Sequence, residues 1–336
     1  MSALKSKSTG INILFLGMLF CNLVLPYFFL PLIEDTTYYT QLFFAQVLLQ
    51  LPVVIYLSFT QTNPCKLISF KLFNPGAAVL VILMTYCVLP LTSLMNLISM
   101  LFVDNAVASV TSVAYENSLG LNLLFIAIIP ALSEEFAFRG VIFHTLKKHG
   151  LWFGVLMSAL FFAMMHLNFN QFSYTIVIGI VMALTVLATG SIWGSVLVHF
   201  TLNANSVLLM KLLESLTAGF GDVESELVDT AMELSYSNGE LVAMIVIIGI
   251  VALIMLIPAG CFLYAIAHIC GKKDVLGPMF FPKKYRTNTG IAHENEPLEA
   301  QGEAETTSKS GNRRILDIFL IIDLIIAFGY MIWVAI

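Results

Sequence analysis

Six side chains with catalytic potential lie inside long apolar stretches of this sequence. They are Glu134, Glu135, Arg139, His166, His199 and Asn203. A carboxylate beside an imidazole can take a proton from water. A second imidazole and an amide can donate hydrogen bonds to the oxyanion that forms on a scissile carbonyl. This combination predicts hydrolysis of an amide bond by an activated water, without a covalent intermediate.

The spacing of these residues predicts different roles for them. Glu135 and Arg139 are four residues apart, so on a helix they can form an ion pair on one face. Glu134 is rotated by about 100° from Glu135, so we expect it to face a watery pocket while the pair acts as a scaffold. His199 and Asn203 are also four residues apart and share a face. The alternative is that the charged groups form a purely structural network and each histidine only bonds a neighbouring helix.

Lipid rather than water must surround most of the chain. The 336 residues are 59% hydrophobic and 11% charged, with a mean hydropathy of +0.91, whereas soluble domains have about 25% charged residues. A net charge of -5 gives no sign of a nucleic-acid partner. The five cysteines are scattered without ligand-like spacing, which predicts neither a disulfide framework nor a zinc ribbon.

Nine apolar stretches have the length of a transmembrane helix, about 17–25 residues. They are 11–33, 41–60, 77–102, 119–147, 151–167, 173–189, 191–212, 241–270 and 315–335. The predicted fold is therefore an all-α, polytopic bundle with a buried active site. We divide the chain into N-terminal helices (1–118), catalytic core helices (119–213) and an acidic extracytoplasmic loop (214–240). A further helix (241–271), a basic and disordered cytoplasmic linker (272–314) and a C-terminal helix (315–336) follow. The acidic loop is predicted to hold a short amphipathic helix at 223–234.

Basic residues alternate between loops in the way that sets membrane orientation. Loops with Lys5, Lys66, Lys147 and the stretch from Lys272 to Arg314 alternate with loops that are acidic or neutral. Cytoplasmic loops carry the excess of Lys and Arg. We therefore expect a multi-pass protein of the plasma membrane with a cytoplasmic N-terminus and an external C-terminus. A bacterial source is expected.

Helix geometry places the polar groups in one layer of the membrane. Counted from the cytoplasmic ends of their helices, Glu134 and His166 lie about 21 and 22 Å deep at 1.5 Å per residue. His199 and Asn203 lie roughly 12 and 18 Å deep by the same rise. We therefore expect a site about halfway into the bilayer that opens toward the cytoplasm.

Three motifs in this chain resemble those of a known family of membrane proteases. The family pattern is EExxxR, then FxxxH, then HxxxN or HxxxD on successive core helices. The matching residues here are Glu134-Glu135 with Arg139, Phe162 with His166, and His199 with Asn203. The chain thus resembles the CAAX-protease and bacteriocin-processing family, also called Abi or CPBP, which includes the Ras-converting CAAX endopeptidase. The resemblance covers roughly residues 119–210.

The resemblance implies an intramembrane endopeptidase that cleaves a membrane-associated peptide or protein. Its general base would be Glu134, acting with His166 on a water. The remaining roles would be stabilisation of the oxyanion by His199 and Asn203, and support of the site by Glu135, Arg139 and Phe162. In a bacterium, peptide processing, bacteriocin maturation or self-immunity fits better than a prenylated substrate.

The resemblance leaves metal dependence open. The family is often labelled metalloprotease, and Glu134, His166 and His199 could supply three ligands to Zn²⁺ or another divalent metal. The sequence has no HExxH helix, however, so these ligands would come from three separate spans. No cofactor is certain from the sequence.

Two other functions would use the same buried groups. One is a non-enzymatic immunity or binding protein that contacts a membrane partner, and the other is a proton-coupled transporter. The intact motifs favour a protease over the first, and the absence of a visible internal repeat argues against the second. The expected partners are membrane lipid and a peptide or protein substrate, with no nucleic acid.

Overall fold

The computed structural model describes residues 8–29, 37–103, 118–217, 238–280 and 317–335. These residues form helices joined by short turns, and no strand occurs among them. Eight of the described helical segments are long and apolar enough to cross a membrane, and one shorter apolar helix accompanies them. The prediction of an all-α, multi-pass membrane protein with about nine spans is therefore confirmed.

The first part of the bundle has three long helices and two short ones. They are α1 (Ser8–Leu23), α2 (Leu25–Phe29), α3 (Tyr38–Thr60), α4 (Pro64–Leu67) and α5 (Pro75–Ser99). Local sequence signals set the helix ends. The Asn74 side chain accepts hydrogen bonds from the first amides of α5, and Pro75 follows where an N–H would have no intrahelical partner. Gln61 directly follows α3 and adopts the left-handed conformation that often ends a helix.

The middle of the chain supplies the motif residues. Residues 119–149 run as one continuous helix composed of α7 (Leu119–Asn122), η2 (Leu123–Ile128), α8 (Ile129–Glu135), η3 (Phe136–Phe143), α9 (His144–Leu146) and η4 (Lys147–His149). The next helices are α10 (Leu151–Met165), α11 (Phe169–Thr189) and α12 (Ile192–Thr217). Gly150 lies between η4 and α10, and Gly190 lies close to the junction of α11 and α12. Both have a positive φ, which glycine adopts without a steric penalty.

The last part of the chain has two long helices and a short one between them. They are α14 (Asn238–Ile269), α15 (Lys273–Phe280) and α17 (Ile318–Ala335). Helix α15 falls at the start of the predicted cytoplasmic linker 272–314, and its Leu276 is buried in the apolar core. Residues 281–314 of that linker and the predicted amphipathic helix at 223–234 lie outside the described residues.

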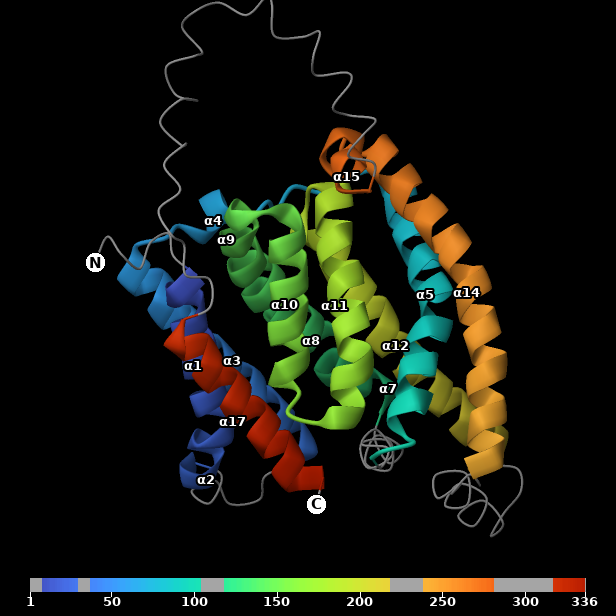
Figure 1. Ribbon diagram of the computed structural model, residues 1–336, viewed down its shortest axis with the longest axis horizontal. Helices are drawn as coiled ribbons and strands as arrows, with labels where there is room; N and C mark the ends of the chain where they lie inside the picture. The colour runs from blue at the N-terminus through green and yellow to red at the C-terminus, as the bar shows by residue number, and fades with distance from the viewer. Residues whose placement is uncertain (1–7, 30–36, 104–117, 218–237, 281–316, 336) are drawn as a thin grey trace, which may run out of the picture.

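Helices α10 and α11 lie side by side in the middle of the bundle (Figure 1). On one flank α5 packs along α14, and on the other α1 packs against α3 and α17. Helix α12 packs against both α11 and α8. The motif helices are therefore enclosed by helices from both halves of the chain.

The two ends of the bundle differ in charge. Six described lysines gather at the end marked by α4, α9 and α15 at the top of Figure 1, namely Lys66, Lys71, Lys147, Lys148, Lys272 and Lys273. We name this the lysine end. At the opposite end, α10 ends at Met165 and α17 ends at Ala335. This separation agrees with the alternation of basic loops along the sequence, while the side of the membrane that each end faces stays a prediction.

Candidate active site

Two π-helical stretches flank the residues that carry the first motif. Helix α8 contains Glu134 and Glu135, and it lies between η2 and η3. Such stretches widen the helix and are frequent at functional sites. The spacing of residues in the sequence gave no sign of them. They alter the local helical register on both sides of the two carboxylates.

Glu135 and Arg139 form the ion pair that their spacing predicts. Arg139 Nη1 donates to Glu135 Oε1 over 2.9 Å, and both side chains are fully buried. His199 Nδ1 donates to the same carboxylate oxygen over 3.0 Å. Glu135 therefore links the helix 119–149 to α12, and its charge is balanced by donors on both helices.

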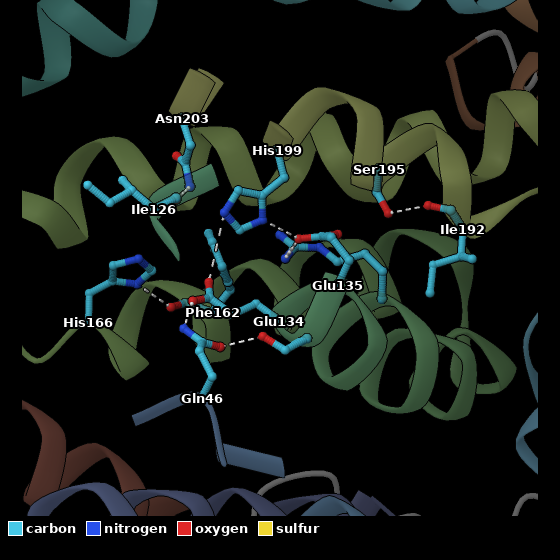
Figure 2. A network of polar contacts seen from close by, with 12 residues as sticks. Gln46, Ile126, Glu134, Glu135, Phe162, His166, Ile192, Ser195, His199 and Asn203 are labelled. Atoms are coloured by element: carbon cyan, nitrogen blue, oxygen red, sulfur yellow. Dashed lines mark hydrogen bonds and ion pairs between the residues drawn. The ribbon is translucent and has the colours of Figure 1, made fainter. Parts of the chain in front are cut away.

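Phe162 lies at the centre of the site, as Figure 2 shows. The guanidinium carbon of Arg139 lies 4.3 Å from the centroid of its ring, which is the geometry of a cation–π contact. The rings of His166 and His199 pack edge-to-face against it at 4.9 and 5.8 Å. The phenyl ring thus fixes the positions of three motif side chains from three different helices.

A close contact between α10 and α11 leaves room for Arg139. Gly179 on α11 packs so tightly against Ala159 on α10 that a Cβ at position 179 would lie 2.8 Å from the Ala159 backbone. The same Cβ would lie 3.2 Å from Arg139 Nη2. The absence of a side chain at Gly179 is therefore a condition for burying the guanidinium at this point.

Glu134 has different partners from Glu135, as expected from their angular separation. Gln46 Nε2 on α3 donates to Glu134 Oε1 over 3.0 Å, and His199 Nε2 lies 3.9 Å from Glu134 Oε2. The Glu134 side chain is 17% exposed, whereas that of Glu135 is fully buried. In Figure 2 its carboxylate lies between His166 and His199. Glu134 is thus the accessible carboxylate of the two.

The protonation pattern of His166 follows from its single hydrogen bond to the backbone. Its Nδ1 lies 2.8 Å from the carbonyl oxygen of Phe162, and a carbonyl can only accept. Nδ1 therefore carries the proton, and in the neutral ring Nε2 keeps its lone pair. His166 directly follows the last residue of α10, at the start of the turn to α11. Its ring is consequently oriented by its own helix, with a proton acceptor on the side away from that bond.

Asn203 connects α12 to the first π-helical stretch. Its Nδ2 donates to the carbonyl oxygen of Ile126 in η2 over 2.9 Å. This bond uses one of the two N–H groups of the amide. Asn203 thus lies on the same face of α12 as His199, but part of its donor capacity serves a structural contact.

The sequence reasoning missed two glutamines on α3. Gln46 bonds Glu134, and its amide oxygen also accepts from the Ser133 hydroxyl. Gln50 Nε2 donates to the Ser133 carbonyl oxygen over 2.7 Å. Both lie inside the predicted span 41–60, where a polar side chain is a functional candidate by default. Their spacing of four residues on one face could have indicated them.

The predicted metal ligands do not form a ligand set in this structure. Among the described residues, no group of three His, Cys, Asp or Glu side chains is arranged to hold a metal ion. Nδ1 of His166 bonds a backbone carbonyl and Nδ1 of His199 bonds Glu135, so Nε2 is the nitrogen that each ring could offer to a metal. Binding of a metal by Glu134, His166 and His199 stays an open prediction.

All of the motif residues fall within one match to a protein-family model. Residues 116–205 match the family of type II CAAX prenyl endopeptidase Rce1-like proteins. The match spans about a quarter of the chain, and it confirms the resemblance over these residues. It indicates a CAAX-type intramembrane protease, which acts on a peptide or protein at the membrane. No curated protein and no solved structure matches the chain.

Gln46 and Gln50 lie outside the matched residues. The helices that precede residue 116 therefore contribute to the site without being part of the family match. The roles of the individual motif residues stay predictions at this point.

Proposed function

We propose that this protein is an intramembrane endopeptidase in which Glu134 and His166 activate a water. The observation that carries the proposal is the position of the half-buried Glu134 carboxylate, which Gln46 holds by a hydrogen bond and which faces His199 at 3.9 Å. The match of residues 116–205 to a family of membrane endopeptidases supports the same reaction class.

In the first step, Glu134 takes a proton from water while the water oxygen attacks the scissile carbonyl carbon. The lone pair on Nε2 of His166 accepts the second hydrogen of that water and orients it. The carbonyl oxygen becomes an oxyanion. Protonated Glu134 then transfers its proton to the leaving nitrogen, which separates the two peptide fragments and regenerates the carboxylate.

The oxyanion is stabilised from α12. His199 donates Nδ1–H to Glu135, so it can donate Nε2–H to the oxyanion only as an imidazolium. Asn203 adds the N–H group that the Ile126 carbonyl does not use. Donors held in this way need little reorganisation when charge develops on the oxygen.

Glu135, Arg139 and Phe162 act as the scaffold of the site. Their mutual contacts balance the buried charge and orient His199, and none of them needs to touch the substrate. For a bacterial chain, we propose a substrate from peptide processing, bacteriocin maturation or self-immunity.

Cleavage by purified protein in nanodiscs tests the proposal. Wild type, Glu134→Gln and His166→Ala are incubated with a membrane-anchored peptide library, and the products are identified by mass spectrometry. Asp274→Asn serves as the control, because it removes an exposed carboxylate of α15 far along the chain from the site. We expect cleavage by wild type and the control, and a loss of about 100-fold or more in both site variants, as for removal of a general base.

Two results would contradict the proposal. Cleavage by Glu134→Gln at the wild-type rate would show that this carboxylate is not the base. Loss of cleavage in wild type on adding a chelator, with recovery on adding back Zn²⁺, would assign the activation of water to a metal.

A further inference from the structure

A cavity of about 530 Å³ lies beside the candidate site at the end of the bundle opposite the lysine end. Its wall includes Asn22 of α1, Tyr27 of α2, His166 after α10, and Tyr330 and Val334 of α17. The volume lies within the range of roughly 300–1,000 Å³ that is typical of ligand pockets. Because His166 belongs to both, a molecule in the cavity lies next to a residue of the candidate site.

The cavity wall has the chemistry of an apolar binding site with a few polar groups. None of its described lining residues is Asp, Glu, Lys or Arg. Tyr27 and Tyr330 offer aromatic surface together with a hydroxyl. Asn22 donates its amide N–H to the carbonyl of Met18 over 3.0 Å, which leaves its amide oxygen as an acceptor. Such a wall suits an uncharged, apolar chain that carries backbone amides.

Leu167 forms part of this wall in an unfavourable backbone conformation. Its φ is 54°, in the left-handed region, where an L side chain is sterically strained. Leu167 lies in the turn that follows α10, directly after His166, and it lines the cavity. Strain of this kind persists where the surrounding structure holds it, and it is common at ligand sites.

The location of the cavity bears on two expectations from the sequence, namely the orientation of the protein in the membrane and the side toward which the site opens. Its lining residues belong to α2 and to the ends of α1, α10 and α17. These helix ends lie in the lower part of Figure 1, whereas the helices of the lysine end lie at the top. If the lysine end faces the cytoplasm, as the excess of basic residues predicts, the cavity faces the other side. The predicted opening of the site toward the cytoplasm concerns the opposite end of the bundle, and it stays a prediction.

We propose, as an extension of the proposed function, that the cavity receives an uncharged, apolar segment of the peptide substrate from the side opposite the lysine end. The bond to be cleaved then lies next to His166. A charged residue in that segment would lose its hydration without finding a partner in the wall.

Substitution of the cavity wall tests this assignment by kinetics. Val334→Trp fills the cavity from α17, whereas Ile332→Trp adds the same group at a half-exposed position of α17 outside the wall. Both are compared with wild type on a membrane-anchored peptide series in which single positions next to the scissile bond are Gly, Leu, Phe, Asp or Lys. We expect Val334→Trp to lower kcat/KM for the best Leu or Phe peptide by about 10-fold or more. A loss of about this size is typical when a substrate is one methylene too large for an apolar pocket. Cleavage of the Gly peptide stays close to wild type, and Ile332→Trp leaves the whole series unchanged.

Failure of this inference is distinguishable from failure of the proposed function. If Glu134→Gln is inactive while Val334→Trp keeps the wild-type preference, the cavity assignment is wrong and the protease stands. If peptides with Asp or Lys at every tested position are cleaved as well as those with Leu, the assignment of an uncharged segment is wrong.

A binding measurement tests the cavity without relying on cleavage. Glu134→Gln protein is irradiated with a Leu-rich peptide that carries a benzophenone side chain, and the labelled residues are mapped by mass spectrometry. We expect labels near Tyr27 and Tyr330, and their loss in the double variant with Val334→Trp. Labels at Lys147 and Lys148 instead, or a phospholipid retained in the cavity while the peptide labels nothing, would overturn the proposal.

Discussion

Two regions of the bundle bury carboxylates, and they satisfy them differently. Around α8, the fully buried Glu135 bonds both Arg139 and His199. On α17, Asp323 is also fully buried, but neither of its carboxylate oxygens has a hydrogen-bond partner among the described residues. The first carboxylate is held in a network, whereas the second is isolated.

A second aspartate, directly before the first residue of α17, sharpens the comparison. Asp317 accepts a hydrogen bond from Asn12 of α1 over 2.9 Å and one from the Leu320 amide over 3.0 Å. It therefore ties the start of α17 to α1. Burial alone does not mark a functional carboxylate in this protein. The hydrogen-bond partners of each group distinguish Glu135, which supports the site, from Asp317, which links two helices, and from Asp323, which has no such partner among the described residues. The predictions below test this distinction.

Arg139→Ala should produce the largest change in stability. Removal of one partner from a buried ion pair leaves an uncompensated charge, so we expect the free energy of unfolding to fall by about 3–5 kcal/mol. Thermal unfolding in detergent measures the effect. Lys273→Ala removes an exposed cation as a control and should change it by less than about 0.5 kcal/mol. Equal unfolding temperatures for Arg139→Ala and wild type would contradict the scaffold role.

Gly179→Ala should disturb the same region through packing alone. The added Cβ meets the Ala159 backbone at 2.8 Å and Arg139 Nη2 at 3.2 Å. Overpacking of this kind costs about 1–3 kcal/mol, which again appears as a lower unfolding temperature. Gly260→Ala on α14 is the matched control, because nothing lies within 4 Å of its new Cβ. If both variants unfold alike, the space at Gly179 does not matter to the network.

Asp323→Val should act in the opposite direction and stabilise the protein. It removes a buried carboxylate that has no hydrogen-bond partner in the described part of the chain, so we expect a gain of about 1–3 kcal/mol in the free energy of unfolding. Asp317→Ala should instead destabilise by about 1 kcal/mol, because it removes the bonds to Asn12 and the Leu320 amide. Unfolding in detergent compares the two. A loss of stability in Asp323→Val would reveal a partner for this carboxylate and end its contrast with Glu135.

Gln46→Leu should have the smallest effect, and it should be kinetic. It removes the donor that holds Glu134. If the loss of this hydrogen bond raises the activation free energy by about 1.4 kcal/mol, kcat falls by about tenfold. The readout is kcat on a cleaved peptide beside the unfolding temperature. Ala45→Leu, at an exposed position of the same helix, is the control. A drop in stability without a drop in kcat would make Gln46 a structural residue.

Much of the architecture could be predicted because lipid restricts the possible structures. A chain in the bilayer must satisfy its backbone polar groups internally, so each apolar stretch becomes a helix. The nine predicted spans accordingly correspond to helices in the described residues. The sequence analysis did not single out α15 within the stretch 272–314, because composition did not reveal that Leu276 is buried in the apolar core.

The site could be predicted where its contacts are local. The ion pair of Glu135 and Arg139 follows from a spacing of four residues, and the different direction of Glu134 follows from the rotation per residue. The bond from Gln46 could not be found in this way, because 88 residues separate it from Glu134. No spacing rule pairs residues on different helices.

The sequence by itself determined the membrane class, the helical spans, the separation of basic loops and the three motifs. Each depends on composition or on short-range periodicity, which a helix converts directly into geometry. Only the tertiary structure decided which helices meet. It alone revealed that α3 holds Glu134 and that Asp323 lacks a hydrogen-bond partner among the residues that the structure describes. It also showed the cavity that reaches His166 from the end opposite the lysines. These features arise from packing between helices that are distant in the chain, and the sequence does not specify such packing residue by residue.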